Sequence, residues 1–519
     1  MRLLLVGLAV NALIVLPAWW RDGVPGSVWL APEAWLLPAT AALLPAGRGG
    51  AVVRAAMAGL LAFAVIAGIF DALVVSVLGR PLNVFIDPLM LGAGFHLIEG
   101  SLGFWAAVLA SLIVAAAAFA VVWGAASALK PDAGRPAMVV LLVALALSLP
   151  PLQARLPGVS TQLPALAAHQ VDQFERTRLA RAALVEAQGH PEFEPRALEG
   201  LTGRDVYVVF VESYGASAIE QARFARTIRP LLDGWRQRLA AAGLSSVSAA
   251  LEAPIRGGQS WLSHATVQSG LPIDNQLWYS MLLSRDIGLL ADDFRATGHW
   301  TVNVAPAIVR DWPEGRQLGF DRVLAAAELG YEGPALGWVT MPDQFTLQAL
   351  SEALGERPDP RRPVFAQVAL ISSHWPWQPV VDLVEPARMD DGRIYRRWAG
   401  RDIDAFSLLF SPRRLRSAYS DSLAYSLEAT FDWAARSLPR DALLIVLGDH
   451  QPVSLVTGRD AGASVPVHVI SADGEVLAAF ARRGFVPGLL PAAVDDPPGL
   501  ERLRHWLRRD FARPRENLP

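Results

Sequence analysis

The clearest indication of fold in this chain comes from residues Asp441–Pro452, with the sequence DALLIVLGDHQP. The six apolar residues Ala442–Leu447 are typical of a strand that is buried on both faces, as in a parallel sheet. Gly448 then lets the backbone turn, and Asp449 and His450 follow at the carboxyl end of the strand. In open α/β sheets this edge binds ligands, and a carboxylate beside an imidazole makes a good pair of metal ligands. Taken alone, the pair predicts either half of a metal site or a solvated turn.

The composition indicates that part of the chain lies in a membrane. The chain has 519 residues, which is too many for one domain. It is 52% hydrophobic and only 18% charged, so membrane spans are expected. The net charge of −3 gives no nucleic-acid footprint, and the absence of cysteine excludes disulfides, thiolate nucleophiles and zinc–cysteine sites. We therefore expect no nucleic-acid partner, and nothing indicates a protein partner.

The apolar residues are concentrated in positions 1–155, which we expect to form a polytopic α-helical membrane domain. A span takes roughly 20 apolar residues. Five stretches reach or approach this length: Leu3–Trp19, Val28–Leu44, Ala55–Leu78, Leu102–Leu129 and Met138–Leu152. The second is the weakest, because two prolines and a glutamate interrupt it. The first is interpreted as a retained helix rather than a cleaved signal peptide, because more spans follow it.

The charged residues near the spans indicate an orientation and one candidate site. Basic residues such as Arg2, Arg48 and Arg54 favour a cytoplasmic N-terminus. With five spans, the C-terminal half is then expected outside the cytoplasm. Asp71 lies inside the third apolar stretch. An intramembrane carboxylate is a functional candidate by default, although an ion pair or a position near the membrane surface explains Asp71 more simply.

The remainder of the chain is expected to form a connector, 156–203, and a second domain, 204–519. Thr161–Gly189 has helical periodicity, and His190–Gly203 is a proline- and glycine-containing linker. From Arg204 onward strand-like and helix-like segments alternate, which predicts an α/β sandwich. The predicted strands are Val206–Val211, Ser245–Leu251, Trp300–Val304, Val364–Leu370, Ala442–Leu447 and Val465–Ile470. The predicted helices are Ala218–Ala241, Arg285–Gly298, Asp343–Leu354 and Ser417–Leu438.

Two further polar positions fall where apolar segments begin or end. Glu212 follows the strand Val206–Val211 directly. Ser260 follows the glycine pair Gly257-Gly258 and opens a helical pattern. A hydroxyl there can act as nucleophile and metal ligand, while the helix N-terminus favours an incoming phosphate. The local pattern fits a helix-capping serine more readily than a nucleophile.

For His374 and His264 the sequence allows either a functional role or a packing role. His374 follows the strand Val364–Leu370, where it is either a substrate contact or a packing residue among tryptophans. His264 lies four residues after Ser260 and hence on the same helical face. It is a candidate for proton transfer or substrate contact, and equally for helix packing. His468 lies within a strand and is expected to be structural.

The order Glu212, Ser260, His374, Asp449-His450 resembles that of the alkaline phosphatase/sulfatase superfamily. Together with five predicted spans, it is most similar to the membrane branch, the lipoteichoic-acid-synthase-like and periplasmic-glucan phosphoglycerol transferases. The resemblance covers both halves of the chain. It implies a multi-pass protein of the bacterial inner (cell) membrane, with a sulfatase-like (alkaline phosphatase-like) domain on the periplasmic or extracellular side.

The resemblance also implies residue roles. Glu212, Ser260, Asp449 and His450 are expected to hold one divalent metal ion, and the residues do not distinguish Mn, Mg or Zn. Ser260 matches the position of the family's nucleophile. His374 is similar to a histidine that contacts substrate, so we expect it to bind substrate and take part in catalysis.

The match is weaker around the expected substrate pocket. Trp312 is similar to a tryptophan that lines the family's glycerol-phosphate pocket, and Trp338 and Asp343 resemble the stretch that follows. The family has a histidine where this chain has Ala305 and an arginine where it has Glu314. Its nucleophile is threonine rather than serine. The expected metal ligands of this chain therefore match the family pattern well, whereas the residues of the expected head-group pocket match it poorly.

The resemblance implies a transferase that moves a phospho-head group, of the phosphoglycerol type, from a membrane lipid donor to an envelope glycan or lipid acceptor. The reaction would pass through a phosphoserine intermediate. The alternative is a sulfatase-like hydrolase that uses water to cleave phosphate or sulfate esters. A non-catalytic sensor or scaffold is disfavoured, because the four metal-site residues occur together.

Overall fold

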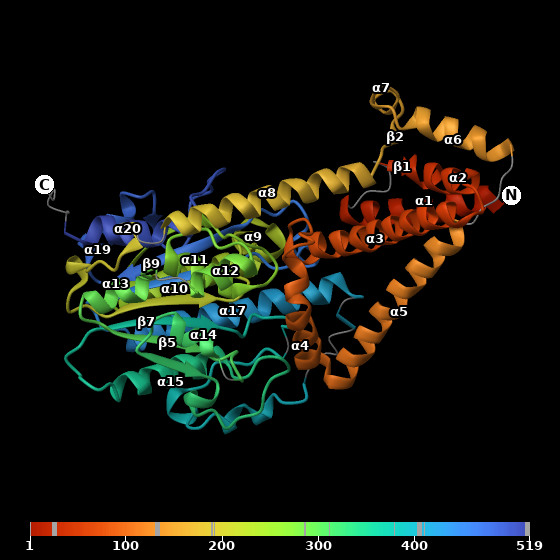
Figure 1. Ribbon diagram of the computed structural model, residues 1–519. Helices are drawn as coiled ribbons and strands as arrows, with labels where there is room; N and C mark the ends of the chain where they lie inside the picture. Colours follow the sequence, from red (N-terminus) through yellow and green to blue (C-terminus); the bar gives the residue numbers. More distant parts are fainter. Residues whose placement is uncertain are drawn as a thin grey trace, which may run out of the picture. The chain divides into compact units, whose positions relative to one another are not determined.

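The computed structural model describes residues 2–22, 28–129, 135–187, 190, 193–284, 287–310, 312–377, 379–401, 407–408 and 410–513. The chain divides into two compact units, Met1–Arg181 and Ala182–Pro519. Their boundary falls within the predicted connector, in helix α8 (Leu163–Ala187). The first two residues of the predicted helix Arg285–Gly298 lie outside the described residues. Figure 1 shows the helices and strands of each unit.

The first unit contains three helices that are long and apolar enough to cross a membrane: α1 (Arg2–Asp22), α3 (Arg48–Leu78) and α5 (Phe104–Ala128). They coincide with the first, third and fourth predicted spans. A shorter helix, α4 (Leu91–Leu102), lies between α3 and α5 in the chain. The membrane character predicted from composition is therefore present in the structure.

The second and fifth predicted spans form shorter helices than expected. Helix α2 (Glu33–Leu43) has 11 residues and α6 (Arg135–Leu147) has 13. At 1.5 Å per residue they are about 17 and 20 Å long, against a hydrocarbon core of about 30 Å. Before α2 the chain is extended, and strand β1 (Val28–Leu30) pairs with β2 (Gly158–Val159). After α6 the chain turns before Pro150, which begins the short helix α7 (Pro150–Gln153). The expected five full spans are thus three in the described part of the chain.

The second unit is built on an eight-stranded sheet with the order β10-β4-β9-β8-β3-β7-β5-β6. The strands from β8 to β6 run parallel, and β9, β4 and β10 add an antiparallel side. All six predicted strands are present. Their bounds are β3 Val206–Val211, β4 Ser245–Glu252, β5 Trp300–Ala305, β7 Val364–Leu370, β8 Leu443–Gly448 and β9 Ser464–Ser471, with β6 Arg322–Ala325 and β10 Val486–Pro487 added at the edges.

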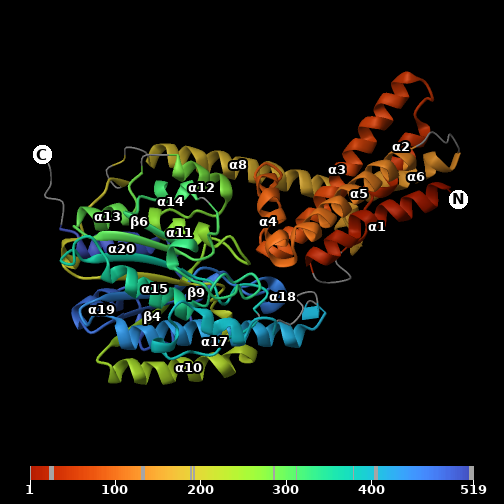
Figure 2. The ribbon, with the colours of Figure 1, turned by 90° about the horizontal axis from the view of Figure 1, so that it is seen from below.

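Helices cover both faces of this sheet, as the unbroken apolar run of β3 requires. Tyr207, Val209 and Val211 pack in one buried cluster, and Val206, Val208 and Phe210 pack in the other. The first cluster is formed with α10 (Ala222–Ala241), α15 (Asp343–Gly355) and α17 (Pro412–Ser437). In this layer α10 and α17 lie side by side (Figure 2). The second is formed with α11 (Ser260–Ser269), α12 (Gln276–Leu283), α13 (Leu290–Ala296), α19 (Gly474–Ala481) and α20 (Arg502–Phe511). The predicted fold class, a helical membrane part followed by an α/β sandwich, is confirmed.

Candidate active site

The central strands place the predicted metal ligands side by side. Strands β3 and β8 are parallel neighbours, and Val211 pairs with Gly448 at their carboxyl ends. The next residues, Glu212 on one strand and Asp449 and His450 on the other, are all buried. One ligand atom from each lies within 4.8 Å of the others. Asp449 and His450 therefore do not form a solvated turn.

Ser260 joins this group from the start of α11. Its Oγ donates a hydrogen bond of 2.8 Å to Oε2 of Glu212 and lies 3.2 Å from Nε2 of His450. The helix cap is Gln259, not Ser260. Gly257 (φ 74°) and Gln259 (φ 68°) both have left-handed backbone, which turns the chain sharply into the helix. The interpretation of Ser260 as a capping residue is therefore wrong, and its hydroxyl faces the carboxylate instead.

Backbone and neighbouring groups hold the ligands in orientations that suit a metal. Oδ1 of Asp449 accepts the backbone N–H of Ser213 at 2.7 Å and that of His450 at 2.7 Å. Nδ1 of His450 lies 2.9 Å from the carbonyl oxygen of Gln451, so this nitrogen carries the proton and donates it. The other ring nitrogen, Nε2, faces Oε1 of Glu212 at 3.3 Å. Because a carbonyl oxygen holds Nδ1–H, Nε2 is the nitrogen that would bind a metal once its own proton is displaced.

The electrostatics of the group favour a bound cation. Burial, together with the charge of Glu212, raises the pKa of Asp449 to about 7. Burial alone would lower the pKa of His450, but the charges of Asp449 and Glu212 outweigh it and raise that pKa to about 9. Burial opposes ionisation of Glu212, yet the charge and hydrogen bond of His450 keep its pKa below the usual range. Two buried carboxylates thus need positive charge beside them. Oxygen ligands with one imidazole fit Mg²⁺, Mn²⁺ or Zn²⁺.

The chain is similar to several solved structures at low sequence identity. No family model matches the chain, and no curated protein matches its sequence. The lipoteichoic acid synthase LtaP from Listeria monocytogenes is 15% identical, with a TM-score of 0.37 over 52% of this chain and 66% of LtaP. A protein in the alkaline phosphatase superfamily from Vibrio parahaemolyticus is 16% identical, with a TM-score of 0.36 over 57% of this chain and 68% of that chain. The Streptococcus pyogenes phosphoglycerol transferase GacH, in complex with sn-glycerol-1-phosphate, is 11% identical, with a TM-score of 0.34 over 57% of this chain and 73% of GacH. This chain therefore spans just under two thirds of the length of LtaP.

His374 lies beside the metal-ligand group, at the end of β7. Its ring stacks on Trp338 with centroids 3.6 Å apart and an interplanar angle of 17°. Nδ1 lies 2.7 Å from the carbonyl oxygen of Trp375, so the proton resides on Nδ1 and Nε2 is an acceptor. Burial lowers the pKa of His374, although the nearby charge of Glu212 opposes the shift. The neutral ring is suited to accept a proton through Nε2.

Asp343 braces the loop that carries His374. Its carboxylate accepts the backbone N–H of Ile371 at 2.7 Å and of Ser372 at 2.9 Å, and the hydroxyl of Ser426 at 2.6 Å. Ser373 in the same loop donates to the carbonyl oxygen of Glu212 at 2.6 Å. Sequence reasoning missed the roles of Ser373 and Ser426, because a single serine in a loop or a helix carries no pattern.

His264 packs against the sheet beneath the site. Its ring centroid lies 4.1 Å from that of Phe210 on β3. Burial lowers the pKa of His264 to about 4, so the ring is neutral. Its Nε2 is buried and has no hydrogen-bond partner among the described residues. Packing is thus shown, and a contact to substrate stays a prediction. His468 is buried within β9, between the Tyr214 hydroxyl (3.0 Å) and the Ser248 hydroxyl (2.8 Å), as expected of a structural residue.

Trp312 packs on the same side of the sheet as the helix that begins at Ser260. It precedes helix α14 (Pro313–Gln317), which contains Glu314, and packs against the buried cluster that includes α11 and α12. In the described part of the chain, no hydrogen bond or ring contact joins it to Glu212 or Ser260. The glycerol-phosphate pocket suggested by Trp312 therefore stays a prediction.

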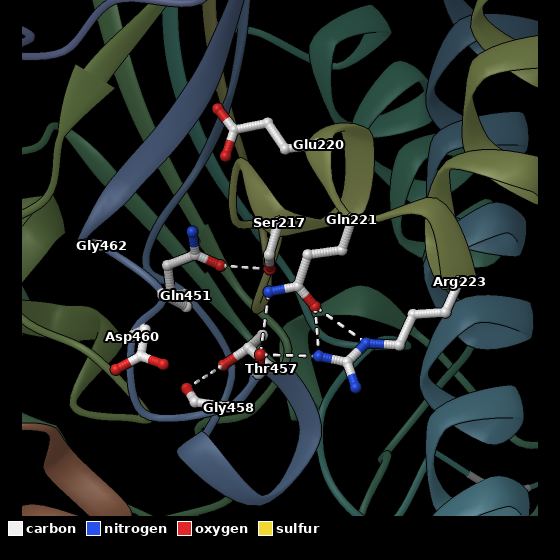
Figure 3. Close-up of a pocket in the computed structure, with 10 residues that line it drawn as sticks. Ser217, Glu220, Gln221, Arg223, Gln451, Thr457, Gly458, Asp460 and Gly462 are labelled. Carbon is white, nitrogen blue, oxygen red and sulfur yellow. Dashed lines mark hydrogen bonds between the residues drawn. The ribbon is translucent and has the colours of Figure 1, made fainter.

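Gln451 is a residue that sequence reasoning passed over, although it directly follows the Asp-His pair. Its carbonyl oxygen accepts both Nδ1–H of His450 and the backbone N–H of Gly257, the latter at 2.8 Å. Its side chain accepts the Ser217 hydroxyl at 2.6 Å and forms one wall of a polar cavity of about 380 Å³ (Figure 3). Gln451 thus ties the histidine ligand to the turn that positions Ser260.

Proposed function

We propose that this chain is a metal-dependent transferase of the cell envelope, with Ser260 as its nucleophile. It would move a phospho-head group from a membrane lipid to a glycan or lipid acceptor. The observation that carries this proposal is the hydrogen bond from the Ser260 hydroxyl to Glu212 inside a buried Glu–Asp–His group. A hydroxyl in such a position is a candidate nucleophile, whereas a purely structural serine has no need of three buried ionisable neighbours.

Glu212, Asp449 and His450 would hold the metal, with the Ser260 oxygen as a fourth ligand. A divalent cation there supplies charge neutralisation for the serine oxygen and for the phosphoryl oxygens. The donor set supports this assignment, because Nε2 of His450 faces Glu212 and both carboxylates are buried. Of the candidate ions, the residues favour none.

The chain's own groups support a two-step transfer. In the first step the bond from Ser260 Oγ to phosphorus forms and the bond from phosphorus to the lipid oxygen breaks. The hydroxyl proton leaves Ser260 along its hydrogen bond to Glu212 and is delivered to the lipid oxygen, so that the lipid leaves as its alcohol. In the second step the bond from the acceptor oxygen to phosphorus forms and the bond from phosphorus to Ser260 Oγ breaks, and the acceptor's proton returns to the Ser260 oxygen. His374 is the candidate to take the acceptor's proton, because it is neutral and its Nε2 is an acceptor.

The test uses the full chain in lipid nanodiscs with head-group-labelled phosphatidylglycerol and phosphatidylethanolamine. Label that reaches an added glycan or lipid acceptor, with diacylglycerol as co-product, would support the transferase. If the label appears only as free head-group phosphate, the transferase proposal fails and the chain acts as a hydrolase. Label that transfers equally well in Ser260→Ala would exclude Ser260 as the nucleophile.

A further inference from the structure

The first unit contains a cavity of about 470 Å³ that the proposed function does not use. Helices α1 and α3, which run side by side (Figure 1), and the start of α8 form its walls. Part of the lining is apolar and includes Leu13 and Ile14 on α1 and Leu166 on α8. Arg21, Asp71 and His169 also line the cavity. The cavity is therefore amphipathic, and two of its three walls are membrane-spanning helices.

Small residues keep this cavity open. The α3 wall contains Ala64 and Gly68, and the α1 wall contains Ala18. A Cβ atom added at Gly68 would lie 4.0 Å from the Cβ of Pro17 on α1, in ordinary van der Waals contact. A longer side chain at Gly68 would therefore enter the space between the two helices. Small residues at a helix–helix contact normally let the helices close together, whereas here a cavity remains beside them.

The polar lining is unusual for a membrane-spanning region. Nη1 of Arg21 lies 3.5 Å from Oδ2 of Asp71, and Oδ1 of Asp71 accepts the backbone N–H of Leu82 at 2.8 Å. The Asp71 side chain is 7% exposed, whereas the Arg21 side chain is 39% exposed. A carboxylate within a span needs such partners. The Arg21 side chain, which also lines the cavity, retains more accessible surface than that of Asp71.

We propose that this cavity binds a glycerophospholipid. An acyl chain would lie along Leu13 and Ile14, and the phosphodiester would meet Arg21, with His169 as a second donor. Arginine matches the geometry of phosphate oxygens. A free sugar would leave the apolar wall without a partner, and a plain hydrocarbon would leave the charged groups without one. The lipid's role as head-group donor rests on the proposed function, whereas the binding site itself does not.

The experiment is photolabelling of the full chain in nanodiscs with acyl-chain-photoactivatable phosphatidylglycerol, phosphatidylethanolamine and diacylglycerol. Labelled peptides from α1 and α3 are quantified by mass spectrometry. We expect the two phospholipids to label the cavity more than diacylglycerol does. Gly68→Leu is expected to reduce that labelling about tenfold, equivalent to about 1.4 kcal/mol. Gly59→Leu is the matched control, because Gly59 lies on the same helix with no atom within 4 Å of an added Cβ.

Correct folding of Gly68→Leu is judged by monodisperse elution and an unchanged melting temperature. If Gly68→Leu does not fold, Arg21→Gln provides a second variant. It is expected to remove the preference for phospholipid over diacylglycerol. Equal labelling of the wild type and Gly68→Leu would overturn the site, and equal labelling by diacylglycerol would overturn phosphate recognition. Turnover of a water-soluble phosphodiester by the wild type tests the proposed function separately. If that turnover is absent while phospholipid labelling persists, the proposed function fails and the lipid site stands.

Discussion

The hydroxyl of Ser260 donates a hydrogen bond of 2.8 Å to Oε2 of Glu212, although the two residues are 48 positions apart in the chain. Glu212 is fixed at the end of the central strand β3, and Ser260 is fixed at the first residue of α11. A strand end and a helix start are rigid parts of the fold, so the pair is preorganised. The contact joins the proposed nucleophile directly to a proposed metal ligand.

Replacing Ser260 by alanine should abolish transfer, with a fall of at least about 10³-fold in kcat. Ser260→Thr keeps the hydroxyl on the same carbon and should retain activity within about tenfold of the wild type. The measurement is the rate of head-group release from labelled lipid in nanodiscs. Ser280→Ala, at an exposed serine on α12, is the control and should match the wild type. Wild-type rates in Ser260→Ala would remove Ser260 from the mechanism.

Removing divalent metal should lower the melting temperature of the full chain, because a ligand that binds only the folded state stabilises it. At a free metal concentration 100-fold above Kd the effect is about 2.7 kcal/mol. Thermal unfolding is measured after chelation and again after Mg²⁺, Mn²⁺ or Zn²⁺ is added back. Glu212→Gln should abolish the metal-dependent shift. Glu252→Gln, at an exposed carboxylate on β4, should preserve it. A shift that survives in Glu212→Gln would place the metal elsewhere.

The sandwich and most of the metal-ligand group could be predicted because their signals are local. Buried strands such as Val206–Val211 are runs of apolar residues, and the acids and histidine follow them directly. The pairing of β3 with β8 then brings together residues that lie more than 200 positions apart. The helix cap was mistaken because Gln259 takes a left-handed conformation that non-glycine residues adopt rarely.

Other features depend on tertiary contacts that no local pattern contains. The lengths of α2 and α6 were overestimated because hydropathy counts apolar residues through Pro32 and Pro150, where the helices begin or end. The bond from Ser373 to Glu212 and the contact of Ser426 with Asp343 join separate segments. Their residue types are common in loops and helices, so only the folded chain shows their use.

Asp343→Ala should loosen the loop that positions His374. Two backbone N–H groups, those of Ile371 and Ser372, would lose their acceptor inside the domain. The expected cost is about 2–5 kcal/mol in stability, with a lower kcat and a KM that changes less. Asp343→Asn keeps one carbonyl oxygen for these donors and should recover most of both losses. Thermal unfolding and steady-state kinetics on the same preparations measure the effect. If Asp343→Asn were as damaged as Asp343→Ala, the carboxylate would have a role beyond holding the loop.

His468 should make the stability of the fold depend on pH below neutrality. Burial lowers its pKa from 6.5 to about 3 in the folded chain. Between these values the unfolded chain binds a proton at this position and the folded chain does not. The free energy of unfolding therefore falls as pH drops below 6.5. From pH 7.5 to pH 5 the loss attributable to His468 is about 2 kcal/mol.

Denaturant unfolding of the full chain and of His468→Gln at pH 7.5 and pH 5 checks this difference. Glutamine does not titrate, and its amide can bond to the Ser248 or Tyr214 hydroxyl that now contacts the ring. We expect the variant to be less stable than the wild type at pH 7.5, with the gap narrowing by about 2 kcal/mol at pH 5. The other histidines titrate alike in both chains, so their contributions cancel in the comparison. Parallel pH profiles would show that His468 is already protonated in the folded chain at pH 5.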